Sequence, residues 1–351
     1  MNILADASLP DLKQAFPAPF ELSYYQNSDE IAVKLQGIDI LICRSTLKIS
    51  DCFFPPNQLR FVATASSGSD PIDKDYLQRS GIELMDAKGC NAQAVADYVM
   101  SCVAWLNNKK LIKGNLAGII GAGKVGSQVK ERLQAAQFTT FSCDPVKALN
   151  EESYFSCTQD DLLQCQLICV HAELHDNLPF PSRNLLDSTF LSRLAPKTII
   201  INAARGSIVN EEALLKEQLV YCTDVYDHEP SIDQRIINYA TLCTPHIAGH
   251  SIEAKQYAIE ILSKKLHQAY SLTPPQFTRP SMQNHAFTER WQDNLLSLYD
   301  PSTETQTLKQ AVDVKKQFLL TRKAHQQRHN FDLYGAKILD EQLQKLLGFI
   351  R

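Results

Sequence analysis

The stretch LAGIIGAGKVG, residues 116–126, constrains the fold of this chain more than any other segment. Gly121, Gly123 and Gly126 directly follow an apolar run and open a helix-like segment. In such a turn the first glycine permits the tight bend and the second lets the backbone approach a pyrophosphate at the helix N-terminus. The third lets helix and strand pack closely. The pattern, with Lys124 and Val125 inside it, predicts a strand–turn–helix unit that binds a dinucleotide.

An acidic residue at the end of the next strand-like run strengthens this prediction. Asp144 lies in TTFSCDP, residues 139–145, where a carboxylate can accept hydrogen bonds from the ribose hydroxyls of NAD and disfavour NADP. The alternative is a glycine-rich turn in a fold that binds nothing. The combination of strand, glycines, helix and acid favours NAD as the cofactor.

Short apolar runs alternate with helix-like segments along most of the chain, which predicts parallel β-α-β units. The predicted strands are 2–6, 39–45, 60–67 and 81–87, and then 116–123, 139–145, 167–173, 198–206, 220–227 and 241–246. Six strands in the second set match a complete doubly wound dinucleotide-binding sheet. Apolar residues at three- and four-residue spacing predict long helices at 92–112 and 252–270.

These elements predict an α/β chain with two Rossmann-like, doubly wound parallel-sheet domains, one inserted in the other. Residues 1–91 and 252–280 would form a substrate domain, and residues 92–251 the NAD-binding domain. A proline-rich break at 273–280 precedes residues 281–351, which are charged and helical in pattern. This last segment is predicted to be a small appended helical or α+β module.

Composition excludes several other classes of protein. The net charge of −4 is spread along the chain, which argues against a nucleic-acid partner. No apolar window reaches the length of a membrane span, and the N-terminus lacks the apolar run of a signal peptide. Ten cysteines occur singly, without a CxxC pair. We therefore expect a reduced cytoplasmic protein with neither disulfides nor a metal site.

Three polar side chains follow consecutive strands of the second set. Arg205, Glu229 and His246 come after the runs at 198–206, 220–227 and 241–246. Ligands of open α/β sheets bind outside the carboxyl ends of the strands, so these groups are expected to converge there. The imidazole can take the hydroxyl proton of a 2-hydroxy acid, the glutamate can orient it, and the guanidinium can hold a carboxylate.

Each of these residues alone has an ordinary structural explanation, as a salt-bridge partner, a solvated acid or a loop histidine. A second polar group follows the strand at 39–45, where Arg44 and Ser45 stand with Thr46 and Lys48. It is either a solvated loop or a site for an anionic group of the substrate.

At these residues the sequence resembles the D-isomer-specific 2-hydroxyacid dehydrogenases. The matching segments are GAGKVG, NAARGSIVNEEALL, DVYDHEP and TPHIAGHSIEA, and the likeness covers about residues 1–270. Further segments, among them ILICRSTLKI, FVATASSGSDPID and GCNAQAVADYV, resemble the branch that oxidises 4-phospho-D-erythronate with NAD. The end of the chain resembles the C-terminal dimerisation module of that branch.

The resemblance implies that Arg205, Glu229 and His246 are catalytic, with His246 the acid and base. It assigns Ser45 and Ser66 to substrate, and implies a homodimer. The residues that it assigns to NAD, besides the glycine turn, are Asp144, Ala203, Ala204, Asp224 and Gly249.

The chain also departs from the family at several positions. His250 stands where the family commonly has tyrosine, and is either a substrate contact or a loop residue. The family motif His-Thr-Pro reads His171-Ala172-Glu173 here. Alternatives therefore stay open: another D-2-hydroxy acid such as 3-phosphoglycerate as substrate, or an NAD-binding interaction protein without catalysis.

Overall fold

The structure is a computed structural model that describes residues 1–51, 53–54, 58–325, 327–337 and 340–349. The chain forms two compact units, each assembled from two stretches of sequence. The first comprises residues 1–91 and 252–280, and the second comprises residues 92–251 and 281–351. Because the chain leaves the first unit and later returns to it, the second unit is built largely from an insertion.

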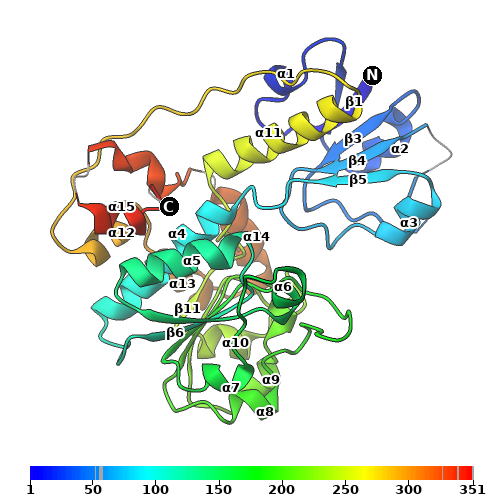
Figure 1. Cartoon of the computed structure of the whole chain (residues 1–351). Helices are drawn as coiled ribbons and strands as arrows, with labels where there is room; N and C mark the ends of the chain where they lie inside the picture. The colour runs from blue at the N-terminus through cyan, green and yellow to red at the C-terminus, as the bar shows by residue number, and fades with distance from the viewer. Residues whose placement is uncertain (52, 55–57, 326, 338–339, 350–351) are drawn as a thin grey trace. The chain divides into compact units, whose positions relative to one another are not determined.

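The first unit holds a five-stranded parallel sheet of order β2-β1-β3-β4-β5. Figure 1 labels β1, β3, β4 and β5 of this sheet. Its strands are β1 Asn2–Asp6, β2 Glu21–Tyr25, β3 Ile40–Cys43, β4 Phe61–Thr64 and β5 Glu83–Asp86. Its helices are α1 Leu12–Ala15, α2 Asp29–Lys34, α3 Lys74–Arg79 and α11 Ile252–Ala269. Apolar clusters on both faces bury the central strands, which explains their continuous apolar sequence.

The second unit holds a six-stranded parallel sheet of order β11-β10-β9-β8-β6-β7. Its strands are β6 Leu116–Ile120, β7 Thr139–Cys143, β8 Leu167–Val170, β9 Ile199–Asn202, β10 Val220–Thr223 and β11 Leu242–Cys243. The chain order reverses between β6 and β8, and such a switch point is where ligands of these sheets bind. The prediction of two parallel-sheet α/β folds is confirmed.

Helices cover both faces of this second sheet and enclose two apolar clusters. They are α4 Ala92–Asn108, α5 Lys124–Ala135, α6 Pro145–Asn150, α7 Gln159–Leu162, α8 Ser188–Leu191, α9 Glu211–Leu214 and α10 Gln234–Tyr239, with a 3-10 turn, η1 Gly206–Ile208. Helix α4 is buried over most of its length, so it is a central element of this unit.

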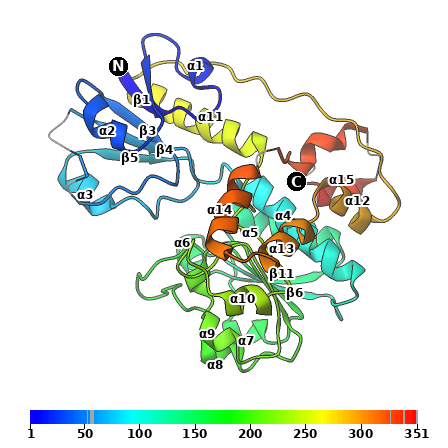
Figure 2. The same cartoon turned by 180° about the vertical axis from the view of Figure 1, so that it is seen from behind.

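The described part of residues 281–349 is helical and contains no strand. Its elements are α12 Trp291–Leu298, α13 Ser302–Lys309, α14 Val314–Ala324, η2 Phe331–Lys337 and α15 Glu341–Leu346. Helix α12 packs against α4, α15 against α5, and α13 against β11, beside which Figure 2 shows α13 and α14. Leu295, Phe331 and Leu346 are buried in the cluster that α4 and α5 form. This segment therefore shares the core of the second unit.

Buried polar contacts around the ion pair of Asp97 and Arg132 attach the C-terminal segment to α4. Oδ1 of Asp97 accepts a hydrogen bond from Nη1 of Arg132, and Oδ2 accepts one from the backbone N–H of Phe331 at 2.9 Å. Nε2 of Gln93 donates to the carbonyl of Leu347 at 3.0 Å. The ion pair joins α4 to α5, and the contacts with Phe331 and Leu347 tie residues separated by more than two hundred positions in the sequence.

None of the described helices combines the length and the apolar character needed to cross a membrane. Within the described residues all nine cysteines are free, and Cys52 lies outside them.

Candidate active site

The glycine-rich turn lies between β6 and α5, at the switch point of the second sheet. Gly121 has a φ of 87°, a left-handed conformation that favours glycine. A Cβ atom on Gly126 would lie 1.9 Å from the carbonyl oxygen of Gly121, so only glycine fits this contact. A Cβ atom on Gly123, by contrast, would meet nothing within 4 Å. The backbone at the N-terminus of α5 is therefore open, as the approach of a pyrophosphate requires.

Asp144 connects the end of β7 to this turn. Its Oδ2 accepts a hydrogen bond from the backbone N–H of Ala122 at 2.8 Å, and its Oδ1 accepts one from that of Lys147 at 2.9 Å. The second bond caps α6. The carboxylate is thus held beside the glycine turn. Its assignment to the ribose of NAD stays a prediction.

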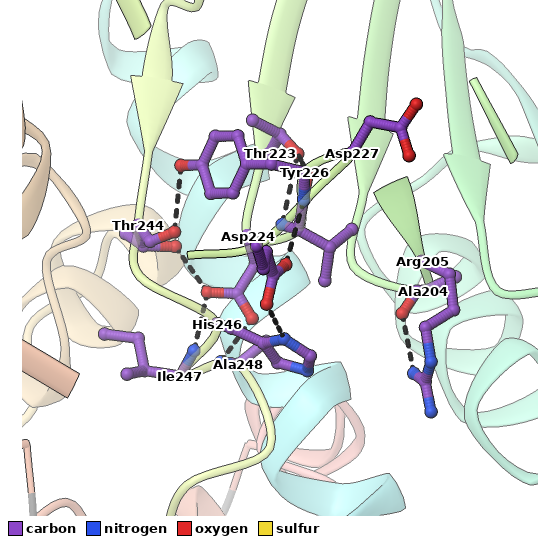
Figure 3. Close-up of polar contacts among 12 residues, drawn as sticks. Ala204, Arg205, Thr223, Asp224, Tyr226, Asp227, Thr244, His246, Ile247 and Ala248 are labelled. Atoms are coloured by element: carbon purple, nitrogen blue, oxygen red, sulfur yellow. Dashed lines mark hydrogen bonds and ion pairs between the residues drawn. The ribbon is translucent and has the colours of Figure 1, made fainter. Parts of the chain in front are cut away.

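His246 and Glu229 form a close pair at the ends of β11 and β10. Nδ1 of His246 lies 2.7 Å from Oε2 of Glu229. Figure 3 draws a dashed line from the ring of His246 for this contact. Oε1 of Glu229 accepts a hydrogen bond from the backbone N–H of Tyr226 at 2.9 Å. Both carboxylate oxygens are engaged, so the carboxylate fixes the orientation of the ring.

The pair is only partly open to solvent, with side chains 31% exposed for His246 and 19% for Glu229. Burial by itself would raise the pKa of Glu229. The charge and hydrogen bond of His246 and the backbone hydrogen bond of Tyr226 outweigh this effect of burial. The pKa of Glu229 therefore lies below its usual value. Glu229 is therefore ionised at neutral pH and stabilises positive charge on the imidazole.

His246 has a φ of 56°, a left-handed conformation that is uncommon for residues other than glycine. Such strain persists only where the surroundings hold the backbone. Here Asp224 supplies that restraint. Its Oδ1 accepts hydrogen bonds from Oγ1 of Thr244 at 2.7 Å and from the N–H of Ile247 at 2.8 Å, and its Oδ2 accepts one from the N–H of Ala248 at 2.7 Å.

Asp224 is 1% exposed, and burial raises its pKa although His246 and these hydrogen bonds favour the charged form. Its carboxylate is directed at the loop 244–248, as Figure 3 shows. The structure thus gives Asp224 a clear contact with the backbone around His246. Its assignment to NAD stays a prediction.

Arg205 follows β9 and begins the turn η1. Nδ2 of Asn202 donates to the carbonyl of Arg205 at 3.0 Å, and Nη1 of Arg205 donates to the carbonyl of Ala204 at 2.8 Å. Gly206 packs so closely on Tyr226 that a Cβ atom there would lie 2.0 Å from a backbone carbon. In Figure 3 the guanidinium of Arg205 and the ring of His246 lie on the same side of the strand ends.

The other predicted NAD residues lie in the same unit. Lys124 and Val125 begin α5, Ala203 and Ala204 follow β9, and Gly249 follows β11. His250 is partly buried, and its ring centroid lies 6.3 Å from that of His325. This contact with the C-terminal segment does not decide between the two interpretations of His250.

The predicted substrate residues Arg44, Ser45 and Ser66 belong to the first unit. Nε of Arg44 pairs with Oδ2 of Asp6 at 2.7 Å, at the switch point between β1 and β3. Ser45 is exposed in the same loop. Oγ of Ser66 donates to the carbonyl of Gly68 at 2.7 Å. Arg44 and Ser45 thus stand in one loop at the carboxyl edge of this sheet, with the Arg44 guanidinium paired to Asp6. Their assignment to an anionic group of the substrate, like that of Ser66 to the substrate, stays a prediction.

Sequence reasoning did not identify the buried groups that hold the loop of His246. Thr244 donates to Asp224, the hydroxyl of Tyr98 lies 2.8 Å from Oγ1 of Thr244, and Arg328 donates to the carbonyl of Ala248. Each looks like an ordinary core or tail residue in the sequence. Only the polar character of Thr244, two positions before His246, gave a signal.

Known proteins resemble this chain along most of its length. Residues 97–248 match the family model described as D-isomer specific 2-hydroxyacid dehydrogenase, NAD binding domain. The chain is 52% identical over 337 residues to an erythronate-4-phosphate dehydrogenase of Legionella pneumophila (strain Lens), covering 95% of this chain and 96% of the relative. It is 33% identical over 327 residues to one of Coxiella burnetii (strain RSA 331), covering 89% and 88%.

Among solved structures, NAD⁺-bound 3-phosphoglycerate dehydrogenase of Entamoeba histolytica aligns with a TM-score of 0.65 at 20% identity, over 77% of this chain and 95% of that one. An NAD-dependent formate dehydrogenase of Staphylococcus aureus in complex with NAD aligns with a TM-score of 0.61 at 22% identity, over 77% and 96%. At these identities the structures show the shared fold. The relatives, matched along nearly the whole chain, show more: the chain belongs to the erythronate-4-phosphate dehydrogenases, a branch of the D-isomer-specific 2-hydroxyacid dehydrogenase family.

Proposed function

We propose that this protein oxidises 4-phospho-D-erythronate at C2, with NAD as the oxidant, to 3-hydroxy-2-oxo-4-phosphooxybutanoate, a step on the route to pyridoxal 5′-phosphate. The observation that carries the proposal is the 2.7 Å pair of His246 and Glu229 in the unit that presents an open glycine turn. The family membership supports the substrate. Oxidation of the alcohol removes a hydride from C2 and a proton from the hydroxyl, and the site must handle both.

His246 takes the hydroxyl proton. With Nδ1 engaged by Glu229, the ring presents Nε2 as the acceptor, and the ionised carboxylate stabilises the charge that the ring gains. Arg205 offers a planar pair of donors to the substrate carboxylate or to the carbonyl oxygen that forms. NAD, when bound at the glycine turn, supplies the acceptor for the hydride.

Substitution of Arg205 by lysine tests the role of its planar group. We expect Arg205→Lys to raise KM for the acid and lower kcat/KM by about 10²-fold, because an ammonium is a point charge without the fork geometry. The NAD dissociation constant should change little. Initial rates and a fluorescence titration with NAD measure both. Unchanged kcat/KM would remove Arg205 from the substrate site.

A panel of acids tests the substrate. The purified chain is assayed with 4-phospho-D-erythronate, D-erythronate, 3-phosphoglycerate and glycolate, and NADH formation is followed by absorbance. We expect the highest kcat/KM for 4-phospho-D-erythronate and a large loss without the phosphate. Preference for 3-phosphoglycerate would favour the alternative substrate. NAD binding without turnover of any acid would favour an interaction protein.

The homodimer and the cytoplasmic location are also proposals. The resemblance of the tail supports the homodimer, as do Leu319 and Leu320 on α14, which are 49% and 51% exposed. Because the tail shares the core of the second unit, a truncation would not test dimerisation cleanly. Sedimentation of the full chain and of a Leu320→Glu variant does. We expect a dimer that the substitution weakens, and a monomeric full chain would remove the proposal.

A further inference from the structure

The backbone of Ala248 is hydrogen-bonded at both its N–H and its carbonyl. Its N–H donates to Oδ2 of Asp224 at 2.7 Å. Its carbonyl accepts a hydrogen bond from Nη2 of Arg328, a residue of the C-terminal segment. The same nitrogen donates to the carbonyl of Ala94 in α4 at 3.0 Å. Arg328 thus connects the loop of His246 to the central helix of the unit.

Aromatic side chains extend this connection into a closed ring of contacts. The guanidinium of Arg328 lies 4.9 Å from the ring centroid of Tyr299, and the ring of Tyr299 lies 6.1 Å from that of Tyr98. The hydroxyl of Tyr98 lies 2.8 Å from Oγ1 of Thr244, which donates to Oδ1 of Asp224 at 2.7 Å. Because Thr244 donates to Asp224, Tyr98 is the donor to Thr244. The ring therefore returns to Asp224, where it began.

Every member of this ring is buried. Tyr98 and Thr244 are 0% exposed, Asp224 1%, and Tyr299 and Arg328 8%. Burying a guanidinium costs desolvation free energy unless hydrogen bonds and other favourable contacts offset it. A guanidinium can lie over the ring of Tyr299 while one of its nitrogens, which carries two hydrogens, donates to two carbonyls. Arg328 is therefore poorly explained as simple packing.

The cavity beside Arg328 does not suggest an anion site. The cavity has a volume of about 400 Å³, and its lining includes the carboxylates of Asp300 and Glu304 as well as Arg328. Nε and Nη1 of Arg328 have no hydrogen-bond partner among the described residues. Nη2, by contrast, donates to the carbonyls of Ala94 and Ala248. The nitrogen that makes contacts is the one directed at the loop of His246.

We propose that Arg328 is a positioning residue for His246. Arg328 binds the carbonyl of Ala248 while Asp224 binds its N–H. Together the two hydrogen bonds keep loop 244–250 in the strained conformation that directs Nδ1 of His246 at Glu229. The C-terminal segment is then part of the active-site framework of its own chain. The inference rests on the role proposed for His246.

Substitution of Arg328 tests this inference by kinetics. We expect Arg328→Ala to lower kcat by about 10²-fold, the cost of a reacting group displaced by about 1 Å. KM and the NAD dissociation constant should stay within about twofold, because the glycine turn is untouched. Added guanidinium should restore part of kcat by entering the vacated space, and the same concentration of NaCl should not. Arg328→Lys should retain part of the activity. Arg290→Ala, which removes an exposed arginine of the same segment, is the matched control and should match the wild type.

Hydrogen exchange supplies a readout that needs no substrate. The amides of Ile247 and Ala248 should exchange faster in Arg328→Ala, whereas those of β6 and β8 should not change. Tyr98→Phe, which breaks the ring at its opposite side, should act in the same direction and guards against a variant that fails to fold.

Wild-type kcat and exchange in Arg328→Ala would overturn the inference. So would equal loss of kcat, NAD affinity and exchange protection across the whole unit, since that describes general destabilisation. If the wild-type chain fails to oxidise 4-phospho-D-erythronate, the proposed function fails. The exchange of the two amides still decides whether Arg328 holds the loop.

Discussion

His246→Ala is expected to lower kcat by about 10³-fold while NAD still binds, because a positioned general base contributes about 10²–10⁴-fold. The substitution removes Nε2, the atom to which the proposed mechanism assigns the hydroxyl proton, and water must replace it. The glycine turn and Asp144 are unchanged, so the cofactor site keeps its shape. Stopped-flow or steady-state rates with 4-phospho-D-erythronate, together with an NAD titration, measure the two effects separately.

Glu229→Gln should also lower kcat, for a different reason. A glutamine can present its NH₂ group to Nδ1 and so favour the tautomer whose Nε2 carries a hydrogen and cannot accept a proton. The pKa of Glu229 lies below its usual value, so the wild-type carboxylate stays ionised as pH falls to the ordinary carboxyl range. The acid limb of the kcat profile should therefore not report titration of Glu229 at its usual value of 4.5.

His285→Ala is the control for His246→Ala, since His285 is a half-buried histidine of the C-terminal segment that contacts Ser297 and lies outside the proposed site. It should leave kcat unchanged. If His246→Ala retains wild-type kcat, the base is another group and the proposed mechanism is wrong. If it loses NAD binding along with kcat, the loop rather than the base is responsible.

The sequence predicted the features that follow from local pattern. Glycine spacing placed the turn after β6, and apolar runs placed ten of the strands within a few residues of their ends. Since the carboxyl ends of parallel strands share one edge, the positions of Glu229 and His246 after neighbouring strands suggested that they meet. A contact between loops of adjacent strands is the kind that strand order alone can suggest.

Strand β2 was missed, because ELSYY is a partly exposed edge strand with only Tyr25 buried. An edge strand lacks the continuous apolar run of central strands, so it looked like a loop. The tail was expected as an appended module because helical periodicity shows that a helix has an apolar face but not what covers it. Residues such as Leu346 pack on α5, far away in the sequence.

The polar framework was not predictable for a similar reason. Asp97 stands in an apolar helix, where a carboxylate is expected to face solvent, and Tyr98 looks like an ordinary core residue that needs no polar partner. Their partners, Arg132 and Thr244, lie on other elements. Only the folded chain shows that these polar groups are buried and paired. They are also where single substitutions should cost most.

Asp97→Ala is expected to lower the free energy of unfolding by about 3–5 kcal/mol, the usual cost of removing one partner of a buried ion pair. Asp97 is 0% exposed and Arg132 1% exposed, so the substitution leaves a guanidinium buried without its carboxylate. It also removes the acceptor of the Phe331 N–H, which anchors the C-terminal segment. Urea unfolding followed by circular dichroism measures the loss.

Asp176→Ala is the matched control, because Asp176 pairs with Arg183 through two hydrogen bonds of 2.8 and 3.1 Å but at the surface. An exposed pair contributes about 0–1 kcal/mol, so this variant should unfold close to the wild type. The double variant Asp97→Ala/Arg132→Met should be more stable than Asp97→Ala alone, since no charge stays buried without a partner. If Asp97→Ala and Asp176→Ala lose the same small amount, water reaches Arg132 and the C-terminal segment is held by its apolar contacts alone.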